Sequence, residues 1–400
     1  MRKENIKYAI LQMVFWTAAA SCYAFMTQIL EAKGFGSSQI GILNAVKLLA
    51  TVVFQMVVGS AADKYAKKVP LKTIIALLAG AATAFTAVFY FGTLSFIGTL
   101  LLFIGFGATF TCISPLIDSL SVLYNDNGMK INYAFGRAAG SAAYAVASVG
   151  LGIFCDRFGG ERLLLLQIIF TFMILVMALF MENMPKQTKN HLMNKSRAEQ
   201  KVHSVGYLLW NYPKFTCFLV GSAVMFMGYN LGTTFLIHVI EEAGGTNAHY
   251  GVAEFVMAIS EVPAAFLIVR CRGKIPMEKV MIGCAFFMTL KNVFAAYSES
   301  VAIIILSQGC EMLGFGMFYA GSVYIVDEML PKTDIVKGMS FINAATVGLG
   351  EGIGSFFCGF LRDELGLHGL MEISVLVGAV SSVCMFFMNW LPRERKGVNL

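Results

Sequence analysis

Twelve long apolar stretches dominate this 400-residue sequence. A helix needs about 20 apolar residues to cross the hydrocarbon core of a bilayer. Stretches of that length recur along the whole chain and are separated by short polar loops. We therefore predict an all-α integral membrane protein with twelve transmembrane helices, at residues 8–30, 38–60, 71–91, 96–123, 134–154, 162–181, 215–239, 250–269, 280–296, 301–326, 338–361 and 371–390.

The composition excludes a water-soluble core. Apolar residues make up 57% of the sequence and charged residues 14%, and the mean hydropathy is +0.70. Soluble domains carry about 45–50% apolar and about 25% charged residues. The nine cysteines are scattered, with no C-x-x-C pair and no His cluster nearby. We therefore expect neither a disulfide framework nor a metal site.

The distribution of basic residues sets the topology. If the N-terminus is cytoplasmic, 24 of the 30 Lys and Arg residues lie on the inner side, four lie in outer loops and two lie inside spans. The positive-inside rule then places both termini in the cytoplasm. The same rule explains the net charge of +6, so we expect no nucleic-acid partner. The apolar run after the basic residues 1–7 is too long for a signal peptide and is assigned to the first helix.

The chain divides into two six-helix halves. We predict an N-terminal bundle at residues 1–181, a polar cytoplasmic linker at 182–214 and a C-terminal bundle at 215–400. The sequence G-I-F-C-D-R-F-G at 152–159 recurs as G-F-L-R-D-E-L-G at 359–366, at the corresponding place in the second half. A pseudo-symmetric pair of halves is typical of transporters with a site between the repeats. The glycine-rich stretch 348–354 contains no phosphate-loop pattern, so we expect close helix packing or a bend there.

The loop after the second predicted span carries a recognisable motif. It reads G-S-A-A-D-K-Y-A-K-K and resembles the G-x-x-x-D-(R/K)-x-G-x-(R/K)-(R/K) signature of the major facilitator superfamily, with Ala66 at the second glycine. The resemblance implies a gating role, in which the small residue lets helices approach and the acid pairs with a base. The residues concerned are Gly59, Asp63, Lys64, Lys67 and Lys68.

Ionisable residues inside the predicted spans are the strongest functional indication. Each costs about 2.5–3.5 kcal/mol or more at the centre of a membrane helix, so it should face a cavity and a partner. Some of them could instead lie near helix ends and extend to the interface, or pair for structural reasons. The candidates are Lys47, Asp118, Arg137, Glu254, Glu261, Lys291, Glu311 and Glu351.

A narrower resemblance connects these residues. R-A-A-G-S at 137–141 resembles the R-x-x-G-(S/C) of the lactose-permease-like oligosaccharide:proton symporters and their broader relatives. Tyr144 stands seven residues on, where that family places a ring against the sugar. Asp118 matches the carboxylate that pairs with Arg137. The resemblance thus implies a substrate site formed by Asp118, Arg137, Tyr144 and Gln308.

The second half resembles the family's proton relay in part. Glu311 stands where the relay has a His, Gln308 where it has a Lys, and Lys291 where it has an Arg. Glu261 and Glu254 are alternative matches to the family's carboxylate in the 250–269 span. Burial favours the neutral form of a carboxyl group and a nearby cation favours the charged form, so Glu311 or Glu261 near Lys291 could gain and lose a proton.

Departures from the family pattern concern a second ion pair. The family's two acidic positions in the seventh span correspond to Asn230 and Gly232, and the Lys that pairs with them corresponds to Val347. Both sides are missing together, as expected because an unpaired buried charge is costly. Lactose itself is therefore in doubt as a substrate, whereas proton coupling is retained.

We predict a secondary active transporter that imports a small polar organic solute with a proton, by alternating access. A sugar or glycoside is the first substrate class, followed by nucleosides or aromatic acids. The alternatives are a proton-driven efflux antiporter for amphipathic compounds and a non-transporting receptor. We expect no enzymatic activity, no cofactor besides the coupling proton, and function as a monomer in the lipid bilayer of the plasma or bacterial inner membrane.

Overall fold

The described part of the chain is helical throughout. The structure, a computed structural model, describes residues 3–65, 68–184 and 204–394, and no strand occurs among them. The expectation of an all-α protein is confirmed. Its helices form two compact units, Met1–Thr188 with Gly244–Ile259 and Lys189–Ala243 with Ser260–Leu400.

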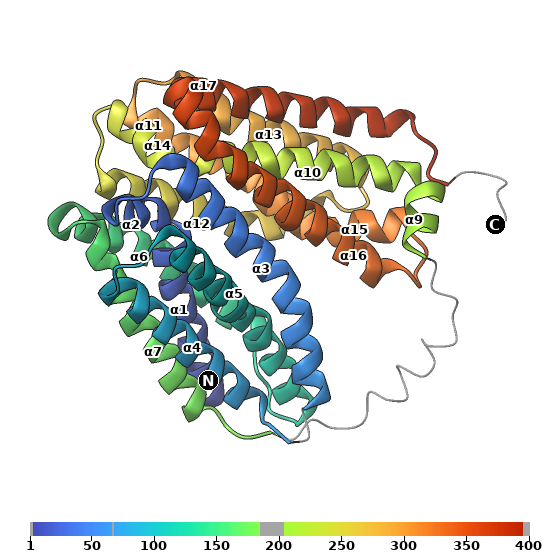
Figure 1. The fold of residues 1–400 in the computed structure, drawn as a ribbon. Helices are drawn as coiled ribbons and strands as arrows, with labels where there is room; N and C mark the ends of the chain where they lie inside the picture. Colours follow the sequence, from blue (N-terminus) through green and yellow to red (C-terminus); the bar gives the residue numbers. More distant parts are fainter. Residues whose placement is uncertain (1–2, 66–67, 185–203, 395–400) are drawn as a thin grey trace. The chain divides into compact units, whose positions relative to one another are not determined.

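The first unit contains the helices of the N-terminal part of the chain and the beginning of α12 (Figure 1). Within it, α1 packs on α6 and α7, α3 on α5, and α4 on α5 and α7. The elements are α1 (Lys3–Tyr23), α2 (Met26–Ala32), α3 (Ser37–Lys64), α4 (Leu71–Phe91), α5 (Phe96–Asp126), α6 (Tyr133–Phe158), η1 (Gly160–Arg162), α7 (Leu163–Phe180) and the first part of α12 (Asn247–Cys271).

The second unit contains the remaining helices and the end of α12 (Figure 1). Here α10 packs on α17 and η3, and α13 packs on α17 and α15. The elements are α9 (Val205–Asn211), α10 (Pro213–Thr233), α11 (Leu236–Glu242), α13 (Met277–Tyr297), α14 (Val301–Ser307), η2 (Gln308–Met312), α15 (Phe315–Met329), α16 (Ile335–Asn343), η3 (Ala344–Glu351), α17 (Gly352–Phe387) and η4 (Met388–Trp390).

The number of membrane-spanning helices depends on how interrupted helices are counted. The described residues contain ten helices that are long and apolar enough to cross a bilayer, or eleven if the bent pair α1 and α2 is one span. The last of these runs from Ile335 to Trp390, which is 56 residues. That run is interrupted at Gly366, where the backbone leaves the helical conformation. Counting the bent pair as one span and the two sides of Gly366 as two gives the twelve spans predicted from the sequence.

The interruption between α1 and α2 is stabilised by side chains of neighbouring helices. The two helices meet at an angle of 52°. Lys47 Nζ on α3 lies 3.5 Å from the carbonyl oxygen of Cys22, and the Tyr250 hydroxyl donates to the carbonyl oxygen of Ala24 at 2.8 Å. A break in a membrane helix leaves backbone carbonyl groups that must find donors inside the protein. Lys47 therefore has a structural role at this break.

Both copies of the octapeptide motif end in a glycine that has the same backbone conformation. Gly159 after α6 has φ 83° and ψ 159°, and Gly366 in α17 has φ 74° and ψ −178°. This region of backbone space is open essentially only to glycine. In the first copy, the Asp156 carboxylate also accepts the backbone N–H groups of Asn247 and Ala248, both at 2.9 Å. The motif thus ends one helix and caps the start of α12.

The glycine-rich stretch forms a wide turn against α10. Residues Ala344–Glu351 are π-helical. A Cβ at Gly350 would lie 2.6 Å from the carbonyl oxygen of Ala223, and a Cβ at Gly354 would lie 2.9 Å from that of Met227. Only glycine allows such a close approach of two helix backbones, which explains the small residues expected there to pack or bend.

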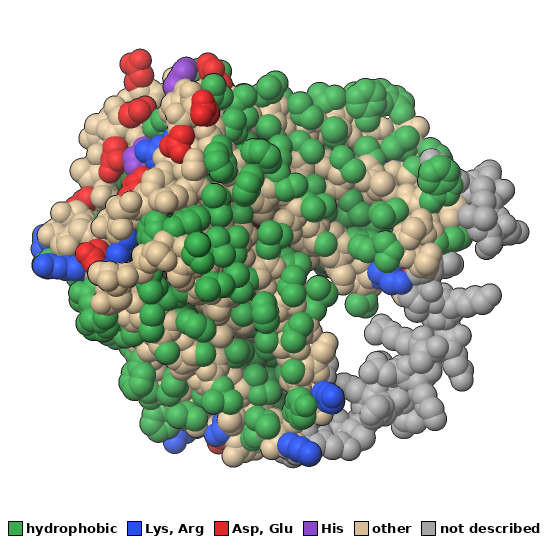
Figure 2. Space-filling model, viewed as in Figure 1, with side chains coloured by type: hydrophobic (Ala, Val, Ile, Leu, Met, Phe, Trp, Pro, Cys, Tyr) green, Lys and Arg blue, Asp and Glu red, His purple; other side chains and the backbone are tan. Residues whose placement is uncertain are grey.

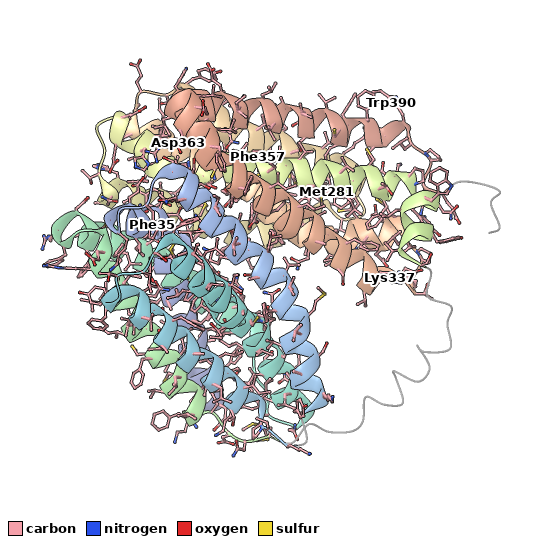
Figure 3. All side chains as sticks on the ribbon, viewed as in Figure 1. Phe35, Met281, Lys337, Phe357, Asp363 and Trp390 are labelled. Atoms are coloured by element: carbon pink, nitrogen blue, oxygen red, sulfur yellow. The ribbon has the colours of Figure 1, made fainter. Side chains whose placement is uncertain are left out.

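Hydrophobic side chains are spread widely over the visible face, and charged side chains gather at the upper left and along the lower edge of the view (Figure 2). Leu77, Phe91 and Phe266 are 66%, 77% and 72% exposed. Inside the second unit, Met281 is fully buried, whereas Trp390 near its end is 64% exposed (Figure 3). Such a surface fits a lipid environment.

The predicted linker at 182–214 is only partly described, because residues 185–203 lie outside the described part of the chain. Its described end forms the short helix α9, and α10 begins at Pro213. The predicted division at 181 and 215 stays a prediction.

Candidate functional site

The first unit brings an aromatic face of α1 onto two glycines of α6. Tyr8, Gln12 and Trp16 are spaced four residues apart and therefore share one face of α1. A Cβ at Gly136 would lie 2.5 Å from Cε1 of Tyr8, and a Cβ at Gly140 would overlap with Cδ1 of Trp16. The glycines thus allow both rings to lie directly on α6. Gly140 is the glycine of the R-x-x-G-(S/C) pattern.

Arg137 stacks on this aromatic face. Its guanidinium carbon lies 4.1 Å from the centre of the Trp16 ring, and Nη1 donates to the Ser141 hydroxyl at 2.7 Å. A cation over an indole ring gains about 2 kcal/mol or more when the pair is desolvated. No ion pair between Arg137 and Asp118 occurs in the structure, although the sequence favoured one. The Trp16 ring contacts the guanidinium group directly, whereas the Asp118 carboxylate acts on its charge only from a distance. The remaining guanidinium N–H groups keep their capacity to donate.

Asp118 is held by a glutamine instead. Gln12 Nε2 donates to Asp118 Oδ1 at 3.1 Å and lies 2.9 Å from the Tyr8 hydroxyl. Trp16 Nε1 donates to Gln12 Oε1 at 3.1 Å. Gln12 therefore connects the carboxylate of α5 to the indole on which Arg137 stacks. Gln12 and Trp16 were not predicted from the sequence, because neither is ionisable and neither matches the family pattern; the available signal was a polar amide inside an apolar span.

Tyr144 connects this network to α12. Its hydroxyl donates to Glu254 Oε2 at 3.0 Å, and its ring meets the Trp16 ring edge-on with the centroids 6.3 Å apart. Glu254 is only 6% exposed. Close packing makes this contact possible, because a Cβ at Gly251 would overlap with the backbone of Ser148. Glu254, predicted as a proton-coupling residue, thus lies in the first unit beside a predicted substrate residue.

The second unit contains a buried ion pair. Lys291 on α13 and Glu311 on η2 pair directly, and their side chains are 2% and 0% exposed. Lys291 Nζ also lies 4.8 Å from the centre of the Tyr229 ring. The span that carries Glu311 is not a regular α-helix here. It changes from α14 to the 3₁₀ segment η2, and Gly314 before α15 has φ −88° and ψ −98°. Interrupted membrane helices often form ion and substrate sites in transporters.

Gln308 begins the same 3₁₀ segment and is also fully buried. Its Nε2 donates to the carbonyl oxygen of Ile304 at 3.1 Å and lies 3.3 Å from the Ser307 hydroxyl oxygen. Among the described residues, neither Gln308 Oε1 nor Glu311 Oε2 has a hydrogen-bond partner. Two buried acceptors without donors are costly, at about 1–3 kcal/mol each.

Glu261 lies farther along α12, where that helix packs on α15. A Cβ at Gly316 would lie 2.7 Å from the Cβ of Ala264 and 3.3 Å from the Cα of Glu261. The same Cβ would lie 3.4 Å from the carbonyl oxygen of Glu311. The structure therefore places the backbone of Glu261 near the segment that carries Glu311, whereas it places Glu254 beside Tyr144.

Neutral hydrogen bonds occupy the place of the family's second ion pair. Asn230 Oδ1 on α10 accepts from the Ser355 hydroxyl on α17 at 2.9 Å and from the Thr234 hydroxyl at 3.1 Å. Asn292 Nδ2 donates to the carbonyl oxygen of Gly228 at 2.9 Å, and the Asn292 side chain fills the space that a Cβ at Gly232 would need. These polar groups are satisfied without a charge.

The predicted gating motif is described in part. No described heavy atom lies within 4 Å of a Cβ built at Gly59, and Lys64 Nζ lies 5.6 Å from the centre of the Tyr65 ring. Lys68 is exposed. Lys67 and the side chain of Asp63 lie outside the described part of the structure. The gating role stays a prediction.

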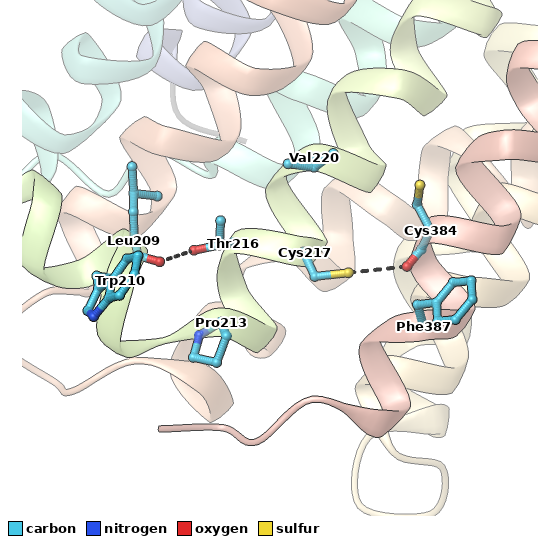
Figure 4. A pocket seen from close by; sticks show the side chains of 8 residues that line it. All are labelled: Leu209, Trp210, Pro213, Thr216, Cys217, Val220, Cys384 and Phe387. Atoms are coloured by element: carbon cyan, nitrogen blue, oxygen red, sulfur yellow. Dashed lines mark hydrogen bonds between the residues drawn. The ribbon is translucent and has the colours of Figure 1, made fainter. Parts of the chain in front are cut away.

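The second unit also has an apolar groove of about 460 Å³ between α9, the start of α10 and the end of α17 (Figure 4). Trp210, Pro213 and Phe387 contribute to its wall. Two of its polar side chains are directed at the backbone: the Thr216 hydroxyl donates to the carbonyl oxygen of Leu209 at 2.6 Å, and the Cys217 thiol lies 3.2 Å from that of Cys384. The groove therefore offers little to a polar solute.

Metal ligands and disulfides do not contribute to either site as described. No group of three or more His, Cys, Asp or Glu residues suited to a metal ion occurs among the described residues. None of the nine cysteines, all of which lie in the described part of the chain, takes part in a disulfide bond.

Solved structures similar to this one include several transporters. A variant of the nucleoside transporter NupG aligns with a TM-score of 0.82 and 13% identity, over 96% of this chain and 100% of that chain. A bacterial homologue of the human lysosomal transporter Spinster, inward-facing and occupied, gives 0.70 and 13% over 98% of both chains. A POT family transporter in complex with 5-aminolevulinic acid gives 0.71 and 12% over 96% and 95%. At these identities the likeness establishes the fold.

No curated protein matches the chain. Residues 5–373, however, match the family described as the MFS_1 like family. That match covers most of the sequence, and it agrees with the helical fold and with the transporters that share it. The chain therefore belongs to the MFS_1 like family and is a membrane transporter of the major facilitator type.

Proposed function

We propose that this transporter imports a small polar organic solute together with a proton, by alternating access. The observation that carries the proposal is the buried Lys291–Glu311 pair, in which one carboxylate oxygen has no described partner. A buried carboxylate beside a cation can exchange its ion pair for a proton, which is the property that a coupling site needs. The basic inner loops support cytoplasmic termini, and the major facilitator fold supports function as a monomer in the cell membrane.

The solute site is assigned to the network of the first unit. Arg137 offers hydrogen-bond donors, Asp118 offers acceptors, and Tyr144 and Trp16 offer ring faces and edges. Hydroxyl-rich neutral solutes use such groups together, because charged donors and acceptors bind hydroxyl groups strongly and rings stack on apolar faces. A sugar or glycoside fits this set and is the first candidate.

A nucleoside is the second candidate, and the aromatic face of the first unit favours it. The rings of Trp16 and Tyr144 lie within 6.3 Å of each other, centre to centre, beside the Arg137 guanidinium. A planar base can stack on such groups while its ribose binds the carboxylate. A nucleoside transporter is also among the proteins that share this fold.

The test uses proteoliposomes that contain the purified protein and no ion gradient. Sugars, nucleosides and aromatic acids are added in turn while an electrode records external pH. Alkalinisation with one class is the expected result and identifies the solute. Acidification with amphipathic compounds would indicate an antiporter, and no response from folded protein would favour a receptor.

Two variants locate the coupling site. Glu311→Gln should abolish accumulation against a gradient yet retain exchange down it, because it removes the group that takes up the proton. Glu278→Gln is the matched control. Glu278 pairs with Lys214 at 2.7 Å in the same unit, but both side chains are partly exposed, at 26% and 15%. Normal accumulation by the Glu311 variant would remove this residue from the coupling mechanism.

A further inference from the structure

Two orphaned acceptors lie on one face of the 3₁₀ segment η2. Gln308 and Glu311 are three residues apart, and side chains at that spacing in a 3₁₀ helix lie one above the other. Both residues are 0% exposed. Each retains one oxygen without a described partner, Gln308 Oε1 and Glu311 Oε2. Two acceptors cannot satisfy each other, so each of the two oxygens lacks a donor.

The orientation of the Gln308 amide is fixed by its other contacts. The atom that lies 3.1 Å from the Ile304 carbonyl oxygen has to be the nitrogen, because a carbonyl oxygen only accepts hydrogen bonds. The Ser307 hydroxyl oxygen lies 3.3 Å from the same nitrogen. Turning the amide over would set oxygen against oxygen. Oε1 is therefore the atom left to accept a further hydrogen bond.

The contacts of Glu311 indicate which of its two carboxylate oxygens can take up a proton. Lys291 on α13 takes Oε1 of Glu311 as its partner, so Oε2 is the oxygen left to be protonated. Helix α14 carries no titratable residue. Further titratable groups on the elements around the site include Tyr229 on α10, Cys284 on α13, Cys310 on η2, Tyr319 on α15 and Glu261 on α12.

We propose that Gln308 is the positioning residue for the coupling proton, which binds Glu311 Oε2 and is donated in a hydrogen bond to Gln308 Oε1. This assignment rests on the proposed proton coupling at Glu311 and gives Gln308 a role other than the predicted solute contact. A single proton from water then satisfies both orphaned acceptors. As the carboxyl O–H bond forms, one O–H bond of a hydronium ion breaks, and the proton passes back to water on release.

Lys291 has a second partner in the protonated state. When Glu311 becomes neutral, the ion pair weakens to a hydrogen bond, and the ammonium group keeps its place 4.8 Å from the centre of the Tyr229 ring. A cation over an aromatic face keeps part of its stabilisation without a counter-charge. The structure therefore supplies partners for both the charged and the neutral forms of Glu311.

The experiment is an infrared pH titration of the full-length protein in lipid nanodiscs, with no solute present. The C=O stretching band of a protonated carboxyl group that Glu311→Gln removes reports the proton on Glu311. Replacing Gln308 by Leu removes the acceptor and should move the midpoint of this band about 0.5–1 pH unit lower. Replacing Gln308 by Glu should move it higher, because two carboxylates that share a site hold one proton more tightly.

Gln167→Leu is the matched control, because Gln167 is 1% exposed and also has an Oε1 atom without a described partner, but it lies on α7 in the first unit. It should leave the band unchanged. If neither Gln308 variant moves the midpoint of an otherwise normal band, the role of Gln308 is wrong and proton coupling at Glu311 stands. If no band depends on Glu311 at any pH, the proton is not held there and this inference is wrong. The pH-electrode assay tests solute transport separately in either case.

Discussion

Gly140 on α6 provides the most direct test of the stacked site in the first unit. An Ala there would place its Cβ against Cδ1 of Trp16, which lies flat on the helix and carries Arg137. Gly150 lies on the same helix, is exposed, and has no heavy atom within 4 Å of a built Cβ. The two sites thus differ mainly in the presence of the ring.

The expected difference in the free energy of unfolding between the two variants follows from two opposing effects. Replacing a helical Gly by Ala stabilises a helix by about 0.5–1 kcal/mol, and this gain applies to both sites. Forcing an extra methyl group into a packed region costs about 1–3 kcal/mol, and this cost applies at Gly140 alone. Gly150→Ala should therefore raise the free energy of unfolding slightly. Gly140→Ala should be less stable than Gly150→Ala by about 1–3 kcal/mol.

Reversible unfolding in mixed detergent micelles measures this difference, with the Gly150 variant as the control for helix propensity. The extra methyl group at residue 140 would displace the Trp16 ring and, with it, the guanidinium group of Arg137. Gly140→Ala should therefore weaken binding of the solute found in the pH-electrode assay, whereas Gly150→Ala should not. Equal stability and equal solute affinity of the two variants would refute the packing of Trp16 on α6.

Three further predictions concern side chains with defined partners. Arg137→Lys should weaken solute binding through loss of the planar group that stacks on Trp16; unchanged affinity in equilibrium binding would contradict the assignment. Asp156→Ala should lower the free energy of unfolding by about 0.5–2 kcal/mol and speed hydrogen exchange of the first amides of α12, and unchanged exchange would count against the cap. Lys291→Met alone should lower the free energy of unfolding by about 3–5 kcal/mol, because it leaves the Glu311 carboxylate buried without its cation, and the double variant with Glu311→Gln should lose less than the sum of the two single variants; additive losses in an unfolding cycle would exclude a mutually stabilising pair.

Hydrophobicity predicted where the helices lie, because a membrane span has to be long and apolar whatever its neighbours are. The predicted span 71–91 coincides with α4. The same signal says nothing about hydrogen bonding along the helix. The break after α1 and the 3₁₀ segment η2 therefore lie inside stretches that the sequence presents as continuous.

The sequence indicated which residues belong to the candidate sites better than it indicated which side chains contact each other. A charged residue in a span is costly, so Lys291 and Glu311 stood out, and the structure brings them together. Asp118 also stood out, but its partner is Gln12 from α1, 106 residues away. Which side chain meets a given charge depends on how the helices pack, and no local pattern in the sequence encodes that distance.

The π-helical turn Ala344–Glu351 sets the angular position of everything that follows it up to Gly366. Each residue of an α-helix advances the chain by about 1.5 Å and turns it by about 100°. A π-helical turn holds one residue more than an α-helical turn does. If this turn changed to α-helical hydrogen bonding, the segment beyond it would shift along its axis and rotate about it, by about the rise and the rotation of one residue. Glycine at 366, whose φ is 74°, would confine that rotation to the helix before it.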